Sequence, residues 1–232
     1  MTREVLGAAE AAGGLVRRPT RLGEEVYTAI YAQLMSLKIA PGGRISVDSL
    51  VREFGVSQTP IREALSRLEA QGLVVKTHLI GYSAADQIGR ERLQQLYELR
   101  LLVEPFAARR AALAITDEAI AALEAVDRKM HEKGHEDARL AYGEFARNDG
   151  TFHDMIALAS GNALVHETLA RLHVHVHLFR LHFHARVTSD ANEEHARILA
   201  AIRGRDPEGA EQVMRDHIER SRERFMVIFD GD

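Results

Sequence analysis

The sequence of 232 residues contains no cysteine and no tryptophan, and only 6% of its residues are aromatic. Without cysteine, disulfide bonds and thiolate zinc sites are excluded. No apolar run approaches the roughly 20 residues that a membrane helix requires. Residues 1–14 carry both charge signs without an apolar core, which is not the pattern of a secretory signal. These absences predict a cytoplasmic protein with no membrane partner.

A strong charge of one sign is also missing. The formal net charge is −4, which by itself does not indicate nucleic-acid binding. The distribution is uneven, because residues 1–85 hold ten basic and eight acidic side chains, whereas the remainder holds twenty basic and twenty-six acidic ones. These signs agree weakly with a DNA-binding front and a ligand-binding back.

The apolar periodicity of the first third predicts helices followed by a hairpin. Pro41-Gly42-Gly43 and Gly55 stop the first two helices, and Pro60 lies in the first turn of the third. The expected elements are helices over residues 22–37 and 47–54, a helix from Ser57 or Thr59 to before Gly72, and strands over 73–75 and 80–82. This order is typical of a winged helix-turn-helix.

From residue 87 onward the period is helical almost throughout, which predicts a bundle of six or seven helices. The expected helices cover residues 90–113, 116–133, 138–159, 163–187, 191–203 and 207–229. Cap-like starts stand at Thr116 and Asp206. The predicted fold is mostly α, with a small β wing. Its expected parts are a flexible tail over residues 1–18, a winged helix-turn-helix DNA-binding domain over 19–85 and an all-helical domain over 86–232.

Two stretches of the sequence resemble one superfamily of regulators. The pattern Ser57-x-Thr59-Pro60-x-Arg62-Glu63-Ala64-Leu65 is quite specific and resembles the DNA-binding domain of the GntR superfamily. The second half resembles the FCD subgroup of that superfamily, whose effector domain is an all-helical bundle. The matching residues there are Glu98-Leu99-Arg100, Glu104, Asp149, Phe152-His153, Glu194-His195, Met214 and His217-Ile218. The resemblance implies a ligand-responsive transcription regulator and not an enzyme.

The start of the third helix is the expected DNA-reading end. Arg62 is the best base-reading candidate, because its planar guanidinium can donate to both acceptors of a guanine edge. The alternative for Arg62-Glu63 is a solvated helix face. The DNA-contacting positions expected from chemistry and resemblance are Ser57, Gln58, Thr59, Arg62, Arg67 and Gly81. The implied partner is a double-stranded operator bound by a homodimer, since one recognition helix reads too few bases.

Two departures from the family pattern bear on DNA affinity. Asp48 stands where some relatives carry a basic phosphate contact, and the wing over residues 76–80 is less basic than usual. We therefore expect affinity to depend more heavily on the recognition helix.

Asp149 and His153 are four residues apart, so they share one helix face and can bind one ion together. In the FCD subgroup a matching Asp and three His hold a divalent metal in the inner cavity, which implies His195 and His217 as the other ligands. This set of nitrogen and oxygen donors favours zinc, with nickel or manganese as alternatives.

The resemblance also implies that a small carboxylate effector takes the open positions on the metal. Arg100 is a candidate to bind the far carboxylate of that effector, because guanidinium groups suit carboxylates. An ion pair with Glu104 on the same helix is an equal alternative.

A run of histidines over residues 171–184 offers a competing metal site. Its members are His173, His175, His177, His182 and His184. The flanking apolar residues keep helical spacing, which favours a helix. On that helix His173 and His177 share one face and approach the cavity, whereas the other three point elsewhere.

The alternative function is a metal-dependent helical-bundle enzyme or an oxygen-binding protein. Such bundles usually supply Glu-x-x-His pairs from facing helices. His131-Glu132 and Glu194-His195 lack that spacing, and no acid or base for a metal-activated water stands out.

Overall fold

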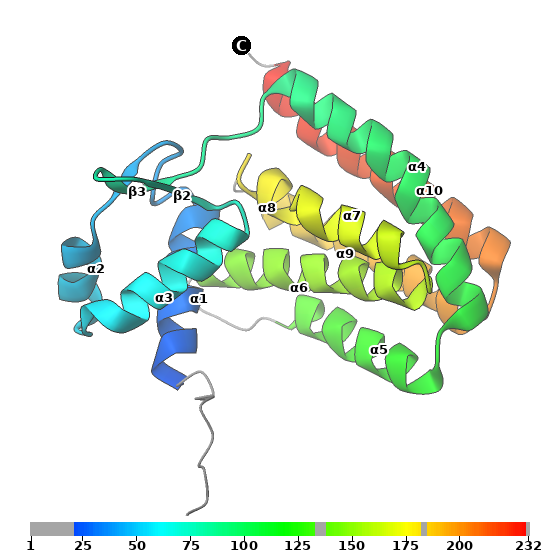
Figure 1. Ribbon diagram of the computed structural model, residues 1–232. Coiled ribbons are helices and arrows are strands. Elements are labelled where there is room, and N and C mark those ends of the chain that lie inside the picture. Colours follow the sequence, from blue (N-terminus) through cyan, green and yellow to red (C-terminus); the bar gives the residue numbers. More distant parts are fainter. Residues whose placement is uncertain (1–20, 133–137, 182–184, 231–232) are drawn as a thin grey trace, which may run out of the picture.

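The computed structural model describes residues 21–132, 138–181 and 185–230, and it has a winged helix-turn-helix followed by a helical bundle (Figure 1). The predicted fold class is confirmed, while the predicted tail over residues 1–18 lies outside the described residues. The front elements are α1 (Arg21–Met35), β1 (Arg44–Ile45), α2 (Val47–Phe54), α3 (Gln58–Ala70), β2 (Val74–Thr77) and β3 (Gly81–Ala84). The bundle comprises α4 (Arg90–Ala114), α5 (Asp117–His131), α6 (Ala138–Ala159), α7 (Ala163–Leu172), α8 (Val174–Phe179), α9 (Ala185–Arg203), α10 (Pro207–Met226) and the 3-10 helix η1 (Val227–Phe229). In the described part of the chain, no helix has the length and apolar character needed to cross a membrane.

Local sequence explains the geometry of the helix-turn-helix. Ser46 caps α2, because its side chain accepts a hydrogen bond from the backbone N–H of Ser49 at 3.2 Å. Gly55 ends α2 in the left-handed region, with φ of 66°, which glycine adopts without a Cβ clash. The chain can therefore turn sharply into α3, whose buried stripe includes Ile61 and Leu65.

The wing is a three-stranded antiparallel sheet in the order β1-β3-β2. Val74 pairs with Ala84 and Thr77 with Gly81. The turn between β2 and β3 places Leu79 at its exposed tip, with φ of 62°. The short β1 was not predicted, because two residues are too few to show a period.

In the bundle, α4 and α10 lie side by side along one edge (Figure 1), and α4 also packs against α6 and α9. The predicted caps are confirmed: the side chain of Thr116 caps α5 and that of Asp206 caps α10. Capping thus fixes where these two helices begin. Helices α4, α6, α9 and α10 contribute to one hydrophobic core.

The single helix predicted over residues 163–187 is wrong. His173 adopts a left-handed conformation with φ of 46°, which ends α7, and α8 stops at Phe179. The next helix begins at Ala185 instead of the predicted residue 191. Tertiary packing accounts for the break, because the His173 ring lies so close to Gly72 that a Cβ there would be 3.3 Å from His173 Cδ2.

The front and the bundle are in direct contact. Helix α1 packs on α6, where a Cβ on Gly143 would lie 3.2 Å from the Cα of Ala32. The segment between β3 and α4 is held by Arg180, which is buried and donates to the carbonyl of Ala85. Gln87 in turn donates to the carbonyl of Arg180 at 2.5 Å. These contacts connect the winged helix-turn-helix to α6 and to the end of α8.

Candidate metal centre and DNA-binding face

The structure brings the four predicted metal ligands together in the interior of the bundle. Asp149 and His153 come from α6, His195 from α9 and His217 from α10, and all four are buried. One ligand nitrogen from each of the three histidines lies within 4.8 Å of the others. The Asp149 Oδ1 atom lies 3.3 Å from His195 Nε2. Side chains from three helices therefore converge on a volume of the size of one ion.

Two carboxylates orient the histidine rings from outside this cluster. His153 Nδ1 donates to Glu104 Oε2 at 2.7 Å, and His217 Nδ1 donates to Glu194 Oε2 at 2.8 Å. Arg224 holds Glu194 with two hydrogen bonds of 2.7 and 2.8 Å. A carboxylate behind each ring fixes the tautomer that leaves Nε2 with its lone pair, which is the usual environment of a metal-binding histidine.

Several buried nitrogens of the cluster have no hydrogen-bond partner among the described residues. They are His153 Nε2 and both ring nitrogens of His195. Buried polar atoms in folded proteins are nearly always paired, so orphaned nitrogens that face one another require an explanation. A cation bound between the rings would accept the lone pairs of His153 Nε2 and of one His195 nitrogen, and the donor set therefore fits a divalent metal ion.

The electrostatics of the cluster also suit a cation. Burial alone would raise the pKa of Asp149, but the neighbouring His175, His195 and His153 hold it well below its usual range. Burial lowers the pKa of His217 to about 4 and brings the pKa of His195 well below its usual value. At neutral pH the cluster therefore presents the Asp149 carboxylate and the neutral imidazoles of His195 and His217, which are the forms that bind metal.

His175 on α8 is a fifth member of the site that sequence reasoning missed. Its Nδ1 donates to Asp149 Oδ2, and it groups with Asp149 and His153 as a second candidate ligand set. The prediction that His175 points elsewhere is wrong, because the left-handed residue His173 resets the helical phase on which it rested. His173 does reach the neighbouring cavity, but His177 lines a separate one beside Arg92. His182 and His184 lie outside the described residues.

Arg100 forms the ion pair that was one of its two predicted roles. It is buried and forms an ion pair with Glu104, with an Nε–Oε1 distance of 2.5 Å. Its Nη1 atom, however, has no hydrogen-bond partner in the described part of the chain. The ion pair expected from the i,i+4 spacing is therefore present, and a donor remains for a bound anion.

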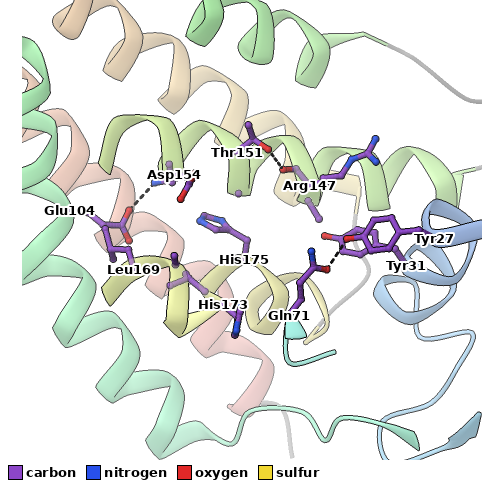
Figure 2. Close-up of a pocket in the computed structure, with 15 residues that line it drawn as sticks. Tyr27, Tyr31, Gln71, Glu104, Arg147, Thr151, Asp154, Leu169, His173 and His175 are labelled. Atoms are coloured by element: carbon purple, nitrogen blue, oxygen red, sulfur yellow. Dashed lines mark hydrogen bonds and ion pairs between the residues drawn. The ribbon is translucent and has the colours of Figure 1, made fainter. Parts of the chain in front are cut away.

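Two cavities that adjoin the cluster bear on ligand binding. The inner one, of about 10 Å³, is lined by Arg100, Asp149, His175 and His217. The outer one, of about 400 Å³, lies between the front and the bundle and includes His153 and His175 in its wall (Figure 2). His175 thus lies at the boundary between the metal cluster and the larger cavity.

The predicted DNA-reading residues share one exposed surface at the start of α3. Ser57, Gln58, Thr59 and Arg62 are all exposed there. Arg62 Nη2 donates to Gln58 Oε1 at 3.3 Å, and Gln58 Nε2 donates to Asp48 Oδ1 at 2.9 Å. Asp48, noted as a departure from the family pattern, therefore orients Gln58 beside Arg62.

The two other predicted DNA contacts have different surroundings. Gly81 begins β3 with φ of 113°, a backbone conformation that favours glycine, although open space lies where a Cβ would be. Arg67 pairs with Glu24 on α1 at 2.7 Å, and its guanidinium lies 4.0 Å from the centre of the Tyr27 ring. This pairing competes with the predicted contact of Arg67 to the DNA backbone.

Sequence reasoning assigned no role to Glu194 or Arg224, and gave Glu104 only its ion pair with Arg100. Glu104 and His153 are 49 residues apart in the chain, so spacing on one helix could not reveal their contact. For Arg224 a weak indication existed: it follows His217 by two helical turns and therefore lies on the same face of α10.

Two successive parts of the chain match known protein families. Residues 22–81 match the family of bacterial regulatory proteins called the gntR family, and residues 95–220 match the FCD domain. The Nta operon transcriptional regulator of Aminobacter aminovorans is 29% identical over 198 residues, which cover 85% of this chain and 91% of that protein. The HTH-type transcriptional regulator LutR of Bacillus subtilis (strain 168) is 32% identical, with 78% and 90% covered.

Among solved structures, E. coli McbR/YncC superimposes with a TM-score of 0.62 at 20% sequence identity. The match covers 91% of this chain and 98% of the other. At this identity the likeness shows the shared fold alone.

Proposed function

This chain belongs to the gntR family of bacterial regulatory proteins and carries an FCD domain, and on that premise we propose that a divalent metal and a small carboxylate effector control its binding to operator DNA. The chain is a DNA-binding transcription regulator and not an enzyme, as are the relatives that it matches. We assign DNA binding to residues 19–85 and effector binding to residues 86–232.

The metal is held by Asp149, His153, His195 and His217. The observation that carries this assignment is that the buried His153 and His195 both keep Nε2 atoms without a hydrogen bond to any described residue. Three imidazoles and one carboxylate suit zinc, with nickel or manganese as alternatives. When bound, the ion supplies positive charge and an open coordination position to an acidic ligand. His175, which bonds to Asp149, stands beside this set.

The effector is a small carboxylate. Arg100 contributes its free Nη1 atom, and its charge is already held in place by Glu104. A guanidinium that donates to the metal-bound carboxylate of the effector in a buried site forms a charge-assisted hydrogen bond, which is about twice as strong as a neutral one. Effector binding therefore depends on both the metal and Arg100.

DNA is read by the exposed start of α3. Arg62 contacts a base, Ser57, Gln58 and Thr59 contact phosphate and base, and Gly81 lets the wing approach the minor groove. Because one recognition helix reads too few bases, the working form is a homodimer on a two-fold operator.

An exposed apolar face on the bundle supports this assembly. Its large apolar side chains lie on α4, on the end of α6 and on the start of α7: Leu102, Phe106, Leu113, Leu158 and Leu164. Arg110 of α4 donates to the carbonyl of Ser160, which brings these segments together. Exposed apolar patches of this kind mark interaction sites, and a second copy of the chain is the occupant that an operator with two half-sites requires.

The experiment that tests the proposed function measures DNA affinity in the presence and absence of ligand. A binding sequence is first selected from a random duplex library with the full chain. Its dissociation constant is then measured by fluorescence anisotropy, without metal, with zinc and with zinc plus malonate or citrate. We expect a change of about 5–150-fold on ligand binding, the usual range of coupling between two sites. His195→Ala should abolish the change while leaving the affinity without metal intact, and an unchanged wild-type constant would contradict the proposal.

A further inference from the structure

The outer cavity has room for a ligand, whereas the inner one does not. The inner cavity beside Arg100 measures about 10 Å³, which is the space of a single water molecule. The outer cavity measures about 400 Å³, within the range of sites that hold small organic molecules. His175 lines both cavities. An effector whose carboxylate reaches the metal cluster must therefore place the rest of its body in the outer cavity.

The far end of this cavity is formed by the DNA-binding front. Tyr27 and Tyr31 of α1 and Gln71 at the end of α3 line it opposite the bundle (Figure 2). The two tyrosine rings are stacked, with centroids 5.9 Å apart, and the Tyr27 hydroxyl donates to Gln71 Oε1 at 2.7 Å. A molecule in the cavity therefore contacts both halves of the protein.

Two hydrogen-bond donors at this far end, the Tyr31 hydroxyl and the Arg147 guanidinium, are available to a ligand. Tyr31 is only 6% exposed, yet its hydroxyl forms no hydrogen bond to any described residue. Arg147 of α6 is an exposed residue that lines the same region, and within the described ranges its guanidinium has no ion-pair partner. The two acidic residues of the wall are already paired, Glu104 with Arg100 and Asp154 with His166 at 2.8 Å. The far end therefore carries an unpaired positive charge and a free hydroxyl donor.

Between the two ends the wall is mostly apolar, although Thr151 and His173 also line the cavity. Ala146 and Gly150 of α6, Leu169 of α7 and Val174 of α8 line the middle of the cavity. The sequence of groups from the metal cluster outward is thus cation site, apolar wall, then guanidinium and hydroxyl. A linear molecule with a carboxylate at each end and a hydrocarbon middle matches this order.

We infer that the outer cavity binds the body and the distal carboxylate of the effector, which is an elongated dicarboxylate whose far end meets Arg147 and Tyr31. This inference rests on the proposed function, because the near carboxylate binds at the metal cluster. Since Tyr31 and Gln71 belong to the DNA-binding front, the ligand binds one arrangement of the two halves better than others. Its binding free energy is thereby coupled to the position of α3.

The test is isothermal titration of the full zinc-loaded chain with unbranched α,ω-dicarboxylates from malonate to sebacate. In the wild type, affinity should rise with chain length to an optimum at least tenfold tighter than malonate. Arg147→Met should weaken the optimal member about tenfold, and Tyr31→Phe several-fold, because each loses one charge-assisted hydrogen bond. Both variants should bind malonate as the wild type does, since malonate is too short to reach them. Arg128→Met, which alters an exposed arginine of α5 away from the cavity, is the matched control.

The outcomes separate this inference from the proposed function. If malonate and the longer acids bind with equal affinity, or if Arg147→Met has no effect on the longer ones, the metal-linked effector site stands and the role of the outer cavity is overturned. If no member of the series binds the zinc-loaded chain, both are overturned. A length optimum that disappears in Arg147→Met and persists in Arg128→Met supports the inference.

Discussion

Glu104 is the residue on which the metal cluster and the anion site both depend, and Glu104→Gln tests that dependence. One of its oxygens pairs with Arg100 at 2.5 Å and the other accepts from His153 at 2.7 Å. The substitution keeps the shape and the carbonyl acceptor but removes the charge, so Arg100 remains buried without a counter-ion. Breaking a buried ion pair in this way costs about 3–5 kcal/mol, out of a total stability of about 5–15 kcal/mol.

The chain provides a matched control on its surface. Glu24 and Arg67 form an ion pair at 2.7 Å, but their side chains are 47% and 45% exposed, whereas those of Glu104 and Arg100 are 4% and 1% exposed. Exposed pairs contribute about 0–1 kcal/mol, because water screens them. The same Glu→Gln change at Glu24 should therefore lower the free energy of unfolding by less than about 1 kcal/mol.

The assay is urea unfolding of the metal-free protein, monitored by circular dichroism. The free energies of unfolding are compared between variants whose dependence on urea concentration has the same slope. A second measurement is zinc affinity, which Glu104→Gln should weaken about 10–100-fold because the ring of His153 loses its charged partner. Glu24→Gln should leave zinc affinity unchanged. Equal stability losses in the two variants, or normal zinc affinity in Glu104→Gln, would refute the view that Glu104 orients the site.

The remaining predictions concern DNA and assembly. Arg62→Ala should weaken binding to the selected operator by about 1–3 kcal/mol without lowering the melting temperature, because the side chain is exposed; equal affinities in a titration would remove it from base reading. The wild-type chain should sediment as a dimer at micromolar concentration. Leu102→Glu should shift it toward monomer, whereas Leu79→Glu at the exposed wing tip should not; a wild-type monomer would contradict the dimer.

Much of the fold could be predicted because its limits are set by local chemistry. Gly55 ends α2 through a left-handed conformation, and Thr116 and Asp206 begin helices through side-chain caps. Such residues act on their immediate neighbours, so one sequence suffices to recognise them. The break at His173 differs, because it depends on packing against Gly72, which lies far away in the chain.

Less of the metal site than of the fold could be predicted from local sequence. The pair Asp149 and His153 follows from helical spacing, but the arrival of His195 and His217 at the same place was implied only by resemblance to a family. The role of His175 depended on the helical phase of α8, which a single left-handed residue changed. The outer cavity could not be foreseen at all, because its wall combines α1, the end of α3 and four bundle helices.

The central claim is that one divalent ion binds between Asp149, His153, His195 and His217, and metal stoichiometry tests it most directly. The full chain is saturated with zinc, dialysed and measured by elemental analysis, together with His195→Ala and the control His131→Ala, which alters a half-exposed histidine of α5. The account predicts one zinc per chain for the wild type and His131→Ala. For His195→Ala it predicts little or no zinc, with loss of the rise in melting temperature that zinc gives the wild type. Full zinc content in His195→Ala would contradict it.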